Sequence, residues 1–153
     1  MRKERANKGH RGYAAIGLVN PKTNSNVGSV LRASHVYDAK MVAVTGRRYT
    51  RAASDTTAAY RHRPFLQVDK LKDVVPYDCV PVAVEILDGA TPLPDYYHPE
   101  RAFYVFGPED GTLGKDVLKW CRDVVYVPGE ECMNLAACVN VVLYDRMAKR
   151  RKA

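Results

Sequence analysis

The sequence lacks any long apolar run, and no stretch approaches the roughly 20 residues that a helix needs to cross a bilayer. Residues 1–12 are charged and have no apolar centre of the kind that secretion signals carry. We therefore expect neither a membrane protein nor a secreted one, and we expect a cytoplasmic location.

Cysteine is scarce, and the four that occur are Cys79, Cys121, Cys132 and Cys138. No two of them have C-x-x-C spacing, and no histidine cluster accompanies them. This pattern argues against a zinc site and a disulfide framework, and it favours a reducing compartment. We expect no bound metal.

A chain of 153 residues is long enough for one domain and leaves no room for a separate catalytic partner domain. Its apolar and charged fractions, 46% and 27%, are those of a globular protein and exclude a disordered or fibrous chain. We expect residues 1–13 to form a basic N-terminal extension and residues 14–153 a single domain.

The net charge of +7 is unevenly distributed. Residues 1–12 carry +4 and residues 146–153 carry +5, and an interior segment carries a further +4. Three basic clusters on an otherwise acidic body are typical of a protein that binds a polyanion, and nucleic acid is favoured over a mere gain in solubility. We predict that both ends of the chain contact the nucleic acid, together with the interior arginines Arg47, Arg48, Arg51, Arg61 and Arg63.

Short apolar runs alternate with helical patterns along the chain, and residues 46–63 read as a loop with a helical turn at 54–60. The runs predict strands over residues 14–19, 40–45, 80–87, 102–106 and 123–127. Helical spacing predicts helices beginning within 24–26 and reaching 35, and over 68–75, 114–120 and 135–150. Apolar strands that alternate with helices indicate an α/β fold with a parallel sheet flanked by helices.

In a parallel sheet, ligands bind at the loops that leave the carboxyl ends of the strands. One such loop leads into the segment from Asn26 to Arg32. There Asn26 can cap a helix, Gly28 permits close approach by a ligand, and Arg32 can reach a phosphate or an oxyanion. A routine cap followed by an exposed helix arginine explains the segment equally well.

Two further loops carry unusual residues. In the segment 106–113, Gly107 and Pro108 form a turn, and Glu109 points a carboxylate into the same crevice. In the segment 127–137, Asn134 lies among apolar neighbours, where its amide needs hydrogen-bond partners. A plain turn and a plain helix cap are the simpler explanations of these two segments.

Together and in this order, the three segments resemble the motifs of the SPOUT superfamily, specifically the TrmH (SpoU) group of RNA ribose 2′-O-methyltransferases. Residues 26–32 fall on the first motif, N-x-G-x-x-x-R, and residues 106–113 fall on the second. Val127-Pro128, Met133-Asn134-Leu135 and a helix ending in residues 143–145 match the third. The resemblance covers residues 14–147, and the compact size is most similar to the TrmL branch, which methylates the wobble nucleotide of tRNA.

The resemblance implies that S-adenosylmethionine binds in a pocket formed by a C-terminal trefoil knot. It implies a homodimer, in which the motif 1 arginine of one subunit meets the cofactor pocket of the other. The cofactor positions that it implies are Glu85, Gly107, Val127, Cys132 and Leu135.

The resemblance also implies catalytic residues and an RNA partner, most plausibly tRNA. Arg32 would activate the ribose 2′-hydroxyl, either as a base or, as is physically easier for a guanidinium, by stabilising the developing alkoxide or clamping the adjacent phosphate. Asn26 would hold motif 1, while Glu109 and Asn134 would orient the loops and the nucleotide. The arginines of residues 47–63 and both ends of the chain would grip the RNA.

Three alternatives stay open at this stage. The substrate could be ribosomal RNA or another tRNA position. Because Cys132 and Ala136 stand where relatives have serines, the chain could be a non-catalytic SPOUT RNA-binding protein. A small α/β enzyme acting on an acidic metabolite is the third alternative.

Overall fold

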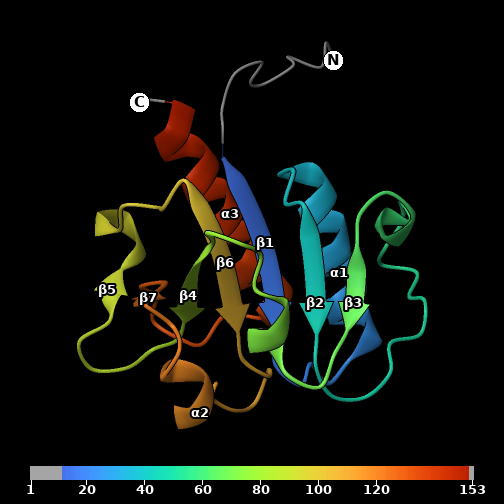
Figure 1. Cartoon of the computed structure of the whole chain (residues 1–153), viewed down its shortest axis with the longest axis horizontal. Coiled ribbons are helices and arrows are strands. Elements are labelled where there is room, and N and C mark those ends of the chain that lie inside the picture. The colour runs from blue at the N-terminus through green and yellow to red at the C-terminus, as the bar shows by residue number, and fades with distance from the viewer. Residues whose placement is uncertain (1–11, 152–153) are drawn as a thin grey trace.

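The computed structural model describes residues 12–151 and has one sheet of seven parallel strands (Figure 1). The strands follow the spatial order β3-β2-β1-β6-β4-β7-β5. Their bounds are β1 Tyr13–Leu18, β2 Met41–Val44, β3 Phe65–Gln67, β4 Val80–Val84, β5 Thr91–Pro92, β6 Arg101–Phe106 and β7 Asp123–Tyr126. The predicted parallel α/β architecture is thus confirmed.

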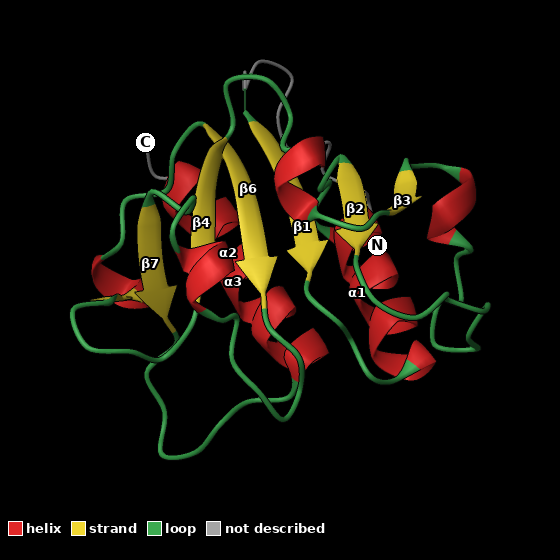
Figure 2. Cartoon of the chain, turned by 60° about the horizontal axis from the view of Figure 1, so that its bottom comes forward, coloured by secondary structure: helices red, strands yellow, loops and turns green. Residues whose placement is uncertain are grey.

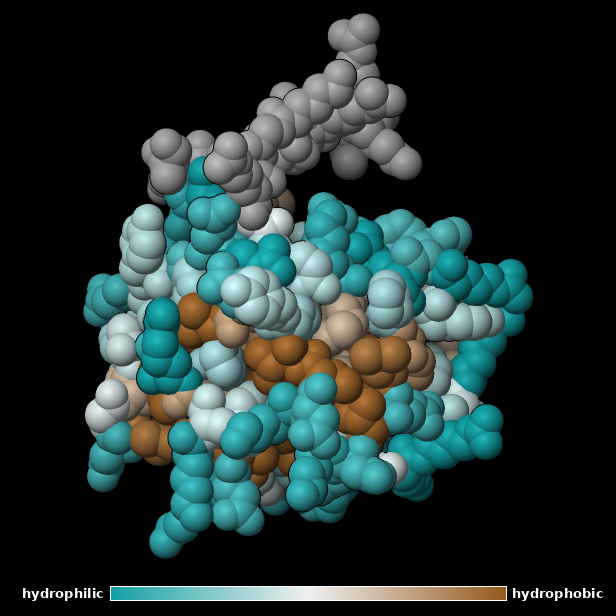
Figure 3. Space-filling view, viewed as in Figure 1, coloured by the Kyte–Doolittle hydropathy of each residue, from teal (hydrophilic) through white to brown (hydrophobic). Residues whose placement is uncertain are grey.

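The helices are α1 Asn24–Val36, α2 Lys115–Leu118 and α3 Leu135–Arg151, with short 3-10 helices at Ala59–Arg61, Leu71–Val74 and Leu93–Asp95. The two long helices, α1 and α3, lie together on one face of the sheet, and the short α2 lies on the other (Figure 2). Apolar side chains show through the middle of that second face (Figure 3). Among the described residues, no helix is long and apolar enough to cross a membrane.

The central strands β1 and β6 are buried along almost their whole length. Ile16 and Leu18 pack towards α1 and α3, whereas Phe103 and Val105 pack towards the opposite face. Because both faces are covered here, these strands show no alternation of polar and apolar residues, which is why they read as continuous apolar runs.

Two strands were not predicted, namely β3 and β5 at the two edges of the sheet. They have three and two residues, which is too few for any periodicity to be visible. The helix predicted over 68–75 is only a 3-10 turn at Leu71–Val74, and that predicted over 114–120 is only Lys115–Leu118. The helical turn predicted at 54–60 lies later, at Ala59–Arg61.

The cap of α1 is Thr23 and not a residue of the segment 24–26. The Thr23 hydroxyl accepts a hydrogen bond from the backbone N–H of Asn26 at 3.2 Å. The prediction that Asn26 caps the helix is therefore wrong. Because Thr23 performs this task, the Asn26 side chain is free to bond elsewhere.

The helix predicted over 135–150 is confirmed as α3, and it buries one apolar face, made of Leu135, Val139, Val142 and Leu143. The helix runs from the carboxyl edge of the sheet back to its amino edge, where β1 and β6 begin (Figure 1).

Basic residues at the end of α3 bond within the fold. Arg146 is only 6% exposed and donates to the carbonyl oxygens of Pro99 and Glu100 at 2.6 and 2.7 Å. Lys149 donates to the carbonyls of Leu93 and Tyr96, and Arg150 donates to that of Glu100. The prediction that this end of the chain contacts RNA is therefore wrong for Arg146. Residues 1–11, 152 and 153 lie outside the described residues.

A buried hydrogen-bond chain joins β6 to α3 around His98. Its two ring nitrogens lie 2.6 Å from the Tyr104 hydroxyl and 2.7 Å from an Asp145 carboxylate oxygen, and Arg146 donates to the Tyr104 oxygen. A neutral imidazole with its proton on Nε2 satisfies every group, because Tyr104 then donates to Nδ1 and Nε2 donates to Asp145. Burial lowers the pKa of His98 to about 4, against the opposing effect of Asp145.

This lowered pKa predicts acid sensitivity. The folded protein disfavours the protonated form of His98, whereas the unfolded chain takes up a proton at the usual pKa of 6.5. The contribution of neutral His98 to stability is therefore complete above pH 6.5 and falls as the pH drops towards 4. We expect His98→Gln to be less stable than wild type by about 1–3 kcal/mol at pH 7.5, because buried partners lose their bonds. The difference should shrink as the pH approaches 4, which urea unfolding at several pH values measures. A difference independent of pH would contradict the neutral assignment.

Candidate functional site

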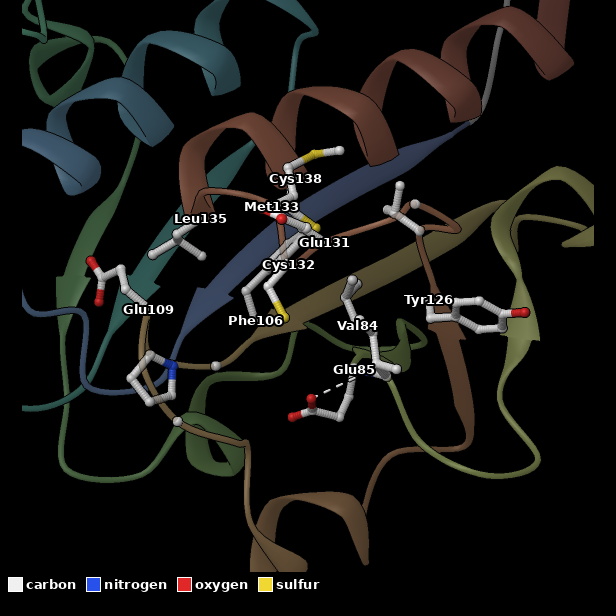
Figure 4. A pocket seen from close by; sticks show the side chains of 16 residues that line it. Val84, Glu85, Phe106, Glu109, Tyr126, Glu131, Cys132, Met133, Leu135 and Cys138 are labelled. Atoms are coloured by element: carbon white, nitrogen blue, oxygen red, sulfur yellow. Dashed lines mark hydrogen bonds between the residues drawn. The ribbon is translucent and has the colours of Figure 1, made fainter.

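A pocket opens at the carboxyl edge of the sheet, where β4, β6 and β7 end (Figure 4). All five residues predicted to bind the cofactor line it, namely Glu85, Gly107, Val127, Cys132 and Leu135. They come from three loops that are far apart in the sequence, and the fold brings them together.

Several residues of the pocket were not singled out from the sequence, among them Ile86, Tyr126 and Cys138. Each is adjacent to a predicted residue, in the chain or one helical turn along α3. Including the residues next to each predicted position, along the loop or one turn along the helix, would have found them.

Glu85 ties the loop after β4 to the loop after β6. One of its carboxylate oxygens accepts from the backbone N–H of Leu113 at 2.9 Å. The other accepts from the N–H of Ile86 at 3.2 Å, a bond drawn in Figure 4. Glu85 thus fixes the shape of the pocket wall that it also lines.

A second network joins residues of all three motifs. Glu109 accepts from the Asn26 side-chain amide at 2.8 Å and from the backbone N–H of Lys22 at 2.9 Å. The Asn26 oxygen accepts from the Asn134 amide at 3.1 Å. The Asn134 oxygen in turn accepts from the N–H of Ala137 at 3.2 Å, which caps the first turn of α3.

The Glu109 carboxylate is ionised at neutral pH. Partial burial opposes ionisation, but the hydrogen bonds from Asn26 and Lys22 outweigh it and lower the pKa of Glu109 below its usual value. A group held in this way accepts hydrogen bonds and does not serve as a proton donor. Its geometry makes it a link between the motif loops.

The pocket is negatively charged. Its lining includes three carboxylates, those of Glu85, Glu109 and Glu131, and no lysine or arginine. Such a lining favours a cationic ligand over a free phosphate.

Arg32 does not line this pocket. It lies on the exposed face of α1, and no hydrogen bond or ion pair joins it to the other residues of 12–151. Val36, one turn further on the same face, is 64% exposed, and Tyr144 of the neighbouring α3 is 56% exposed. The fold thus brings Asn26, Glu109 and Asn134 together but leaves Arg32 apart from them.

Gly28 allows close packing within the chain. A Cβ atom at this position would lie 2.4 Å from the Ser54 hydroxyl and 3.1 Å from the backbone nitrogen of Asp55. The loop after β2 therefore rests directly on α1. The prediction that Gly28 makes room for a ligand is wrong, because its own chain fills that space.

Four of the five predicted RNA-contacting arginines are exposed, and these are Arg47, Arg48, Arg51 and Arg61. The Arg63 side chain is only 13% exposed, pairs with Asp38 at 3.3 Å and donates to the carbonyl of Ala39. Its charge joins the turn before β2 to the start of β3. Arg63 is thus held within the fold, and its contact with RNA stays a prediction.

The described residues contain no group of three or more His, Cys, Asp or Glu side chains that could hold a metal ion. The four cysteines are free.

Residues 13–144 match a family model described as the SpoU rRNA Methylase family. A comparison with curated proteins finds no match. Many solved structures share the fold. One is the SpoU methyltransferase AviRb from Streptomyces viridochromogenes in complex with AdoMet, at 18% identity and a TM-score of 0.82. This comparison covers 92% of the present chain but only 59% of AviRb.

Two other structures are similar over more of their own length. The A. aeolicus TrmH/SpoU tRNA modifying enzyme has 12% identity and a TM-score of 0.81, with 94% of this chain and 78% of that one covered. A structure described as giving insights into the 2-OH methylation of C/U34 on tRNA has 18% identity and a TM-score of 0.78, with 93% and 99% covered. At these identities the likeness shows a common fold.

The geometry predicts energetic coupling between Asn26 and Glu109. In a double-mutant cycle of Asn26→Ala and Glu109→Ala, we expect a coupling energy of about 0.5–1.5 kcal/mol, because each single substitution already breaks the bond between them. Denaturant unfolding measures it. Asp110→Ala is the matched control, since the neighbouring carboxylate bonds to Lys22 and not to Asn26. The control cycle combines Asn26→Ala with Asp110→Ala and should be additive. If the cycle with Glu109→Ala is additive as well, the result would argue against the network.

Proposed function

The chain belongs to the SpoU rRNA methylase family, and from this premise we propose that it transfers a methyl group from S-adenosylmethionine to the ribose 2′-hydroxyl of an RNA nucleotide. The observation that carries the proposal is the convergence of the loops after β4, β6 and β7 on one pocket. Beside it, Glu109, Asn26 and Asn134 hydrogen-bond to one another. Each of these residues lies in a different motif, and their hydrogen bonds hold the three motifs together at one site.

The residues of the pocket fit S-adenosylmethionine. When bound, this cofactor supplies a methyl group on a positively charged sulfonium sulfur. The carboxylates of Glu85, Glu109 and Glu131 favour that charge, and the lining has no cation to oppose it. Apolar side chains such as Phe106 and Leu135 offer a surface for a flat base. At position 132 the lining residue is an exposed Cys132.

The glycine at position 107 lets the loop after β6 pack closely against its own backbone at residues 112 and 113. A Cβ atom there would lie 3.2 Å from the backbone nitrogen of Leu113, so any side chain would crowd the loop after β6. The same backbone nitrogen is held by Glu85. The two residues together keep the backbone of this loop available as a wall of the cofactor site.

Bound S-adenosylmethionine would supply the methyl group to the 2′ oxygen, and the hydroxyl proton would leave to water. A guanidinium is protonated at neutral pH and is a poor base. We therefore assign to Arg32 the stabilisation of the negative charge that develops on the 2′ oxygen. Glu109 and Asn134 position the loops against which the nucleotide lies.

We further propose that the active unit is a homodimer. The exposed face of α1 and α3 carries Val36 and Tyr144, two large apolar side chains of the kind that association buries. Arg32 lies on the same face as Val36. A second copy seated on this face would place Arg32 at the pocket of its partner, which accounts for its separation from the pocket of its own chain. We also include in this proposal a trefoil knot, in which the C-terminal segment passes through a loop of the chain.

We propose tRNA, at the wobble nucleotide, as the substrate. The support is the similarity over nearly the full length of both chains to the structure described for C/U34 of tRNA. The rRNA methyltransferase structure from Sinorhizobium meliloti is longer, and only 56% of it is covered. Mass spectrometry of nucleosides from tRNA and rRNA of a deletion strain distinguishes the two substrates by which 2′-O-methyl nucleoside disappears.

Arg32→Ala should lower the rate of methyl transfer by about 100-fold or more, because one charge-stabilising group of the transition state is lost. Binding of S-adenosylmethionine, measured by calorimetry, should stay unchanged, since the role assigned to Arg32 is contact with the 2′ oxygen of the nucleotide and not with the cofactor. Transfer at the wild-type rate would refute the assigned role. Absence of cofactor binding in the wild-type protein itself would favour a non-catalytic RNA-binding protein.

Mixing two inactive variants tests the homodimer. Arg32→Ala removes the arginine, and Gly107→Val crowds the loop that forms a wall of the pocket, so each homodimer should be inactive. A mixed dimer contains one intact pocket that faces one intact Arg32, and co-expression should restore up to about one quarter of wild-type activity for random pairing. No recovery from dimers shown to be mixed would mean that Arg32 acts on its own subunit.

A further inference from the structure

A groove distinct from the cofactor pocket lies beside β3. This strand is at the edge of the sheet, and β2 and β1 separate it from β6 (Figure 1). We call it the arginine groove, and its lining residues are Arg48, Tyr49, Arg51, Tyr60, Phe65 and Gln67. Two of these are exposed cations, three are aromatic, and none is acidic. Its charge is opposite to that of the cofactor pocket.

The groove has an ordered aromatic wall. The rings of Tyr49 and Phe65 meet edge to face with centroids 5.2 Å apart. The Tyr49 hydroxyl accepts from the backbone N–H of Ala52 at 3.1 Å, which fixes the loop that carries Arg51. Tyr60 is half-buried against the same core, and the Arg61 guanidinium lies 5.8 Å from the centre of its ring. These rings are held in place before any ligand binds.

The loop that carries Arg48 and Arg51 is fastened to α1. The Ser54 hydroxyl donates to the carbonyl of Ser25 at 2.7 Å, and Arg47 donates to the carbonyl of Lys22. Gly28 lets the two segments touch. The same helix carries Arg32, so the groove and Arg32 belong to one packed unit with a fixed separation.

We propose that the arginine groove binds one unpaired nucleotide of the RNA, separate from the nucleotide that is methylated, with its base against Tyr60 and its phosphates at Arg48 and Arg51. This inference rests on the proposed RNA substrate and adds to it a requirement for single-stranded RNA. Bases in a duplex are stacked on one another and offer no face to a tyrosine, whereas unpaired bases stack on aromatic side chains. The Gln67 amide adds a donor and an acceptor for a base edge.

The test compares binding of a short fluorescein-labelled single-stranded RNA with that of its duplex, by fluorescence anisotropy. Tyr60→Leu should weaken single-strand binding by roughly 5- to 150-fold, as expected for one lost stacked base, and should change duplex binding little. Tyr60→Phe keeps the ring and should bind as wild type does. The thermal unfolding midpoint of each variant reports whether it is folded. Tyr77→Leu removes a tyrosine that is 93% exposed elsewhere, and it should have no effect.

The arginines are tested by salt dependence. Arg48→Ala with Arg51→Ala should reduce the slope of log affinity against log salt for the single strand by about 1.4, since each phosphate contact on single strands contributes about 0.7. Lys119→Ala with Arg122→Ala removes two exposed cations that pair with Asp116 and Asp123, and the slope should stay the same.

The proposal is overturned if Tyr60→Leu binds the single strand within about twofold of wild type, because the 1–3 kcal/mol of a stacked base would then be absent. Equal losses for single strand and duplex would also overturn it, since the groove would then read phosphates alone. Calorimetry with S-adenosylmethionine on the wild-type protein separates this result from the proposed function. A protein that binds RNA through Tyr60 but binds no cofactor would retain the groove and lose the methyltransferase assignment.

Discussion

The site depends on the hydrogen bonds that the Asn26 side chain makes with its two partners. Its amide donates to Glu109 and accepts from Asn134, so one short side chain satisfies a residue of the loop after β6 and the residue that caps α3. A carboxylate in place of Asn26 could not donate to Glu109, and a serine has less reach. The requirement for both a donor and an acceptor explains why an amide is needed at this position.

Negative and positive side chains gather at two separate places along the same sheet. Carboxylates line the pocket at β4, β6 and β7, and arginines line the groove beside β3, with β1 and β2 between them. A methyl donor with a positive sulfur and a nucleic acid with negative phosphates require opposite fields. Separating the fields across the sheet lets one small chain attract both without either field cancelling the other.

The sequence was sufficient to predict the parallel α/β fold, its buried strands and the loops that form the pocket, because those features follow from apolar runs and turn residues. The sequence was not sufficient to predict which arginines face solvent and which bond within the fold. Arg63 and Arg146 count as basic in any composition, yet one pairs with Asp38 and the other satisfies the carbonyls of Pro99 and Glu100. Whether an arginine faces solvent or a carbonyl depends on contacts between segments distant in the chain, and local pattern does not contain them. Gly28 was misassigned for the same reason, since its neighbour Ser54 comes from another segment.

The position of Arg32 connects the fold to the proposed homodimer. A residue that stabilises charge in a transition state must touch the reacting oxygen, and Arg32 does not line the pocket where the methyl donor would bind. The same face of α1 and α3 leaves Val36 and Tyr144 largely exposed, although burying such side chains contributes about 1.5–3 kcal/mol each. One event, the docking of a second copy on this face, would both cover the apolar side chains and supply the missing arginine. Association would then be a condition of catalysis, and isolated chains would bind the cofactor without using it.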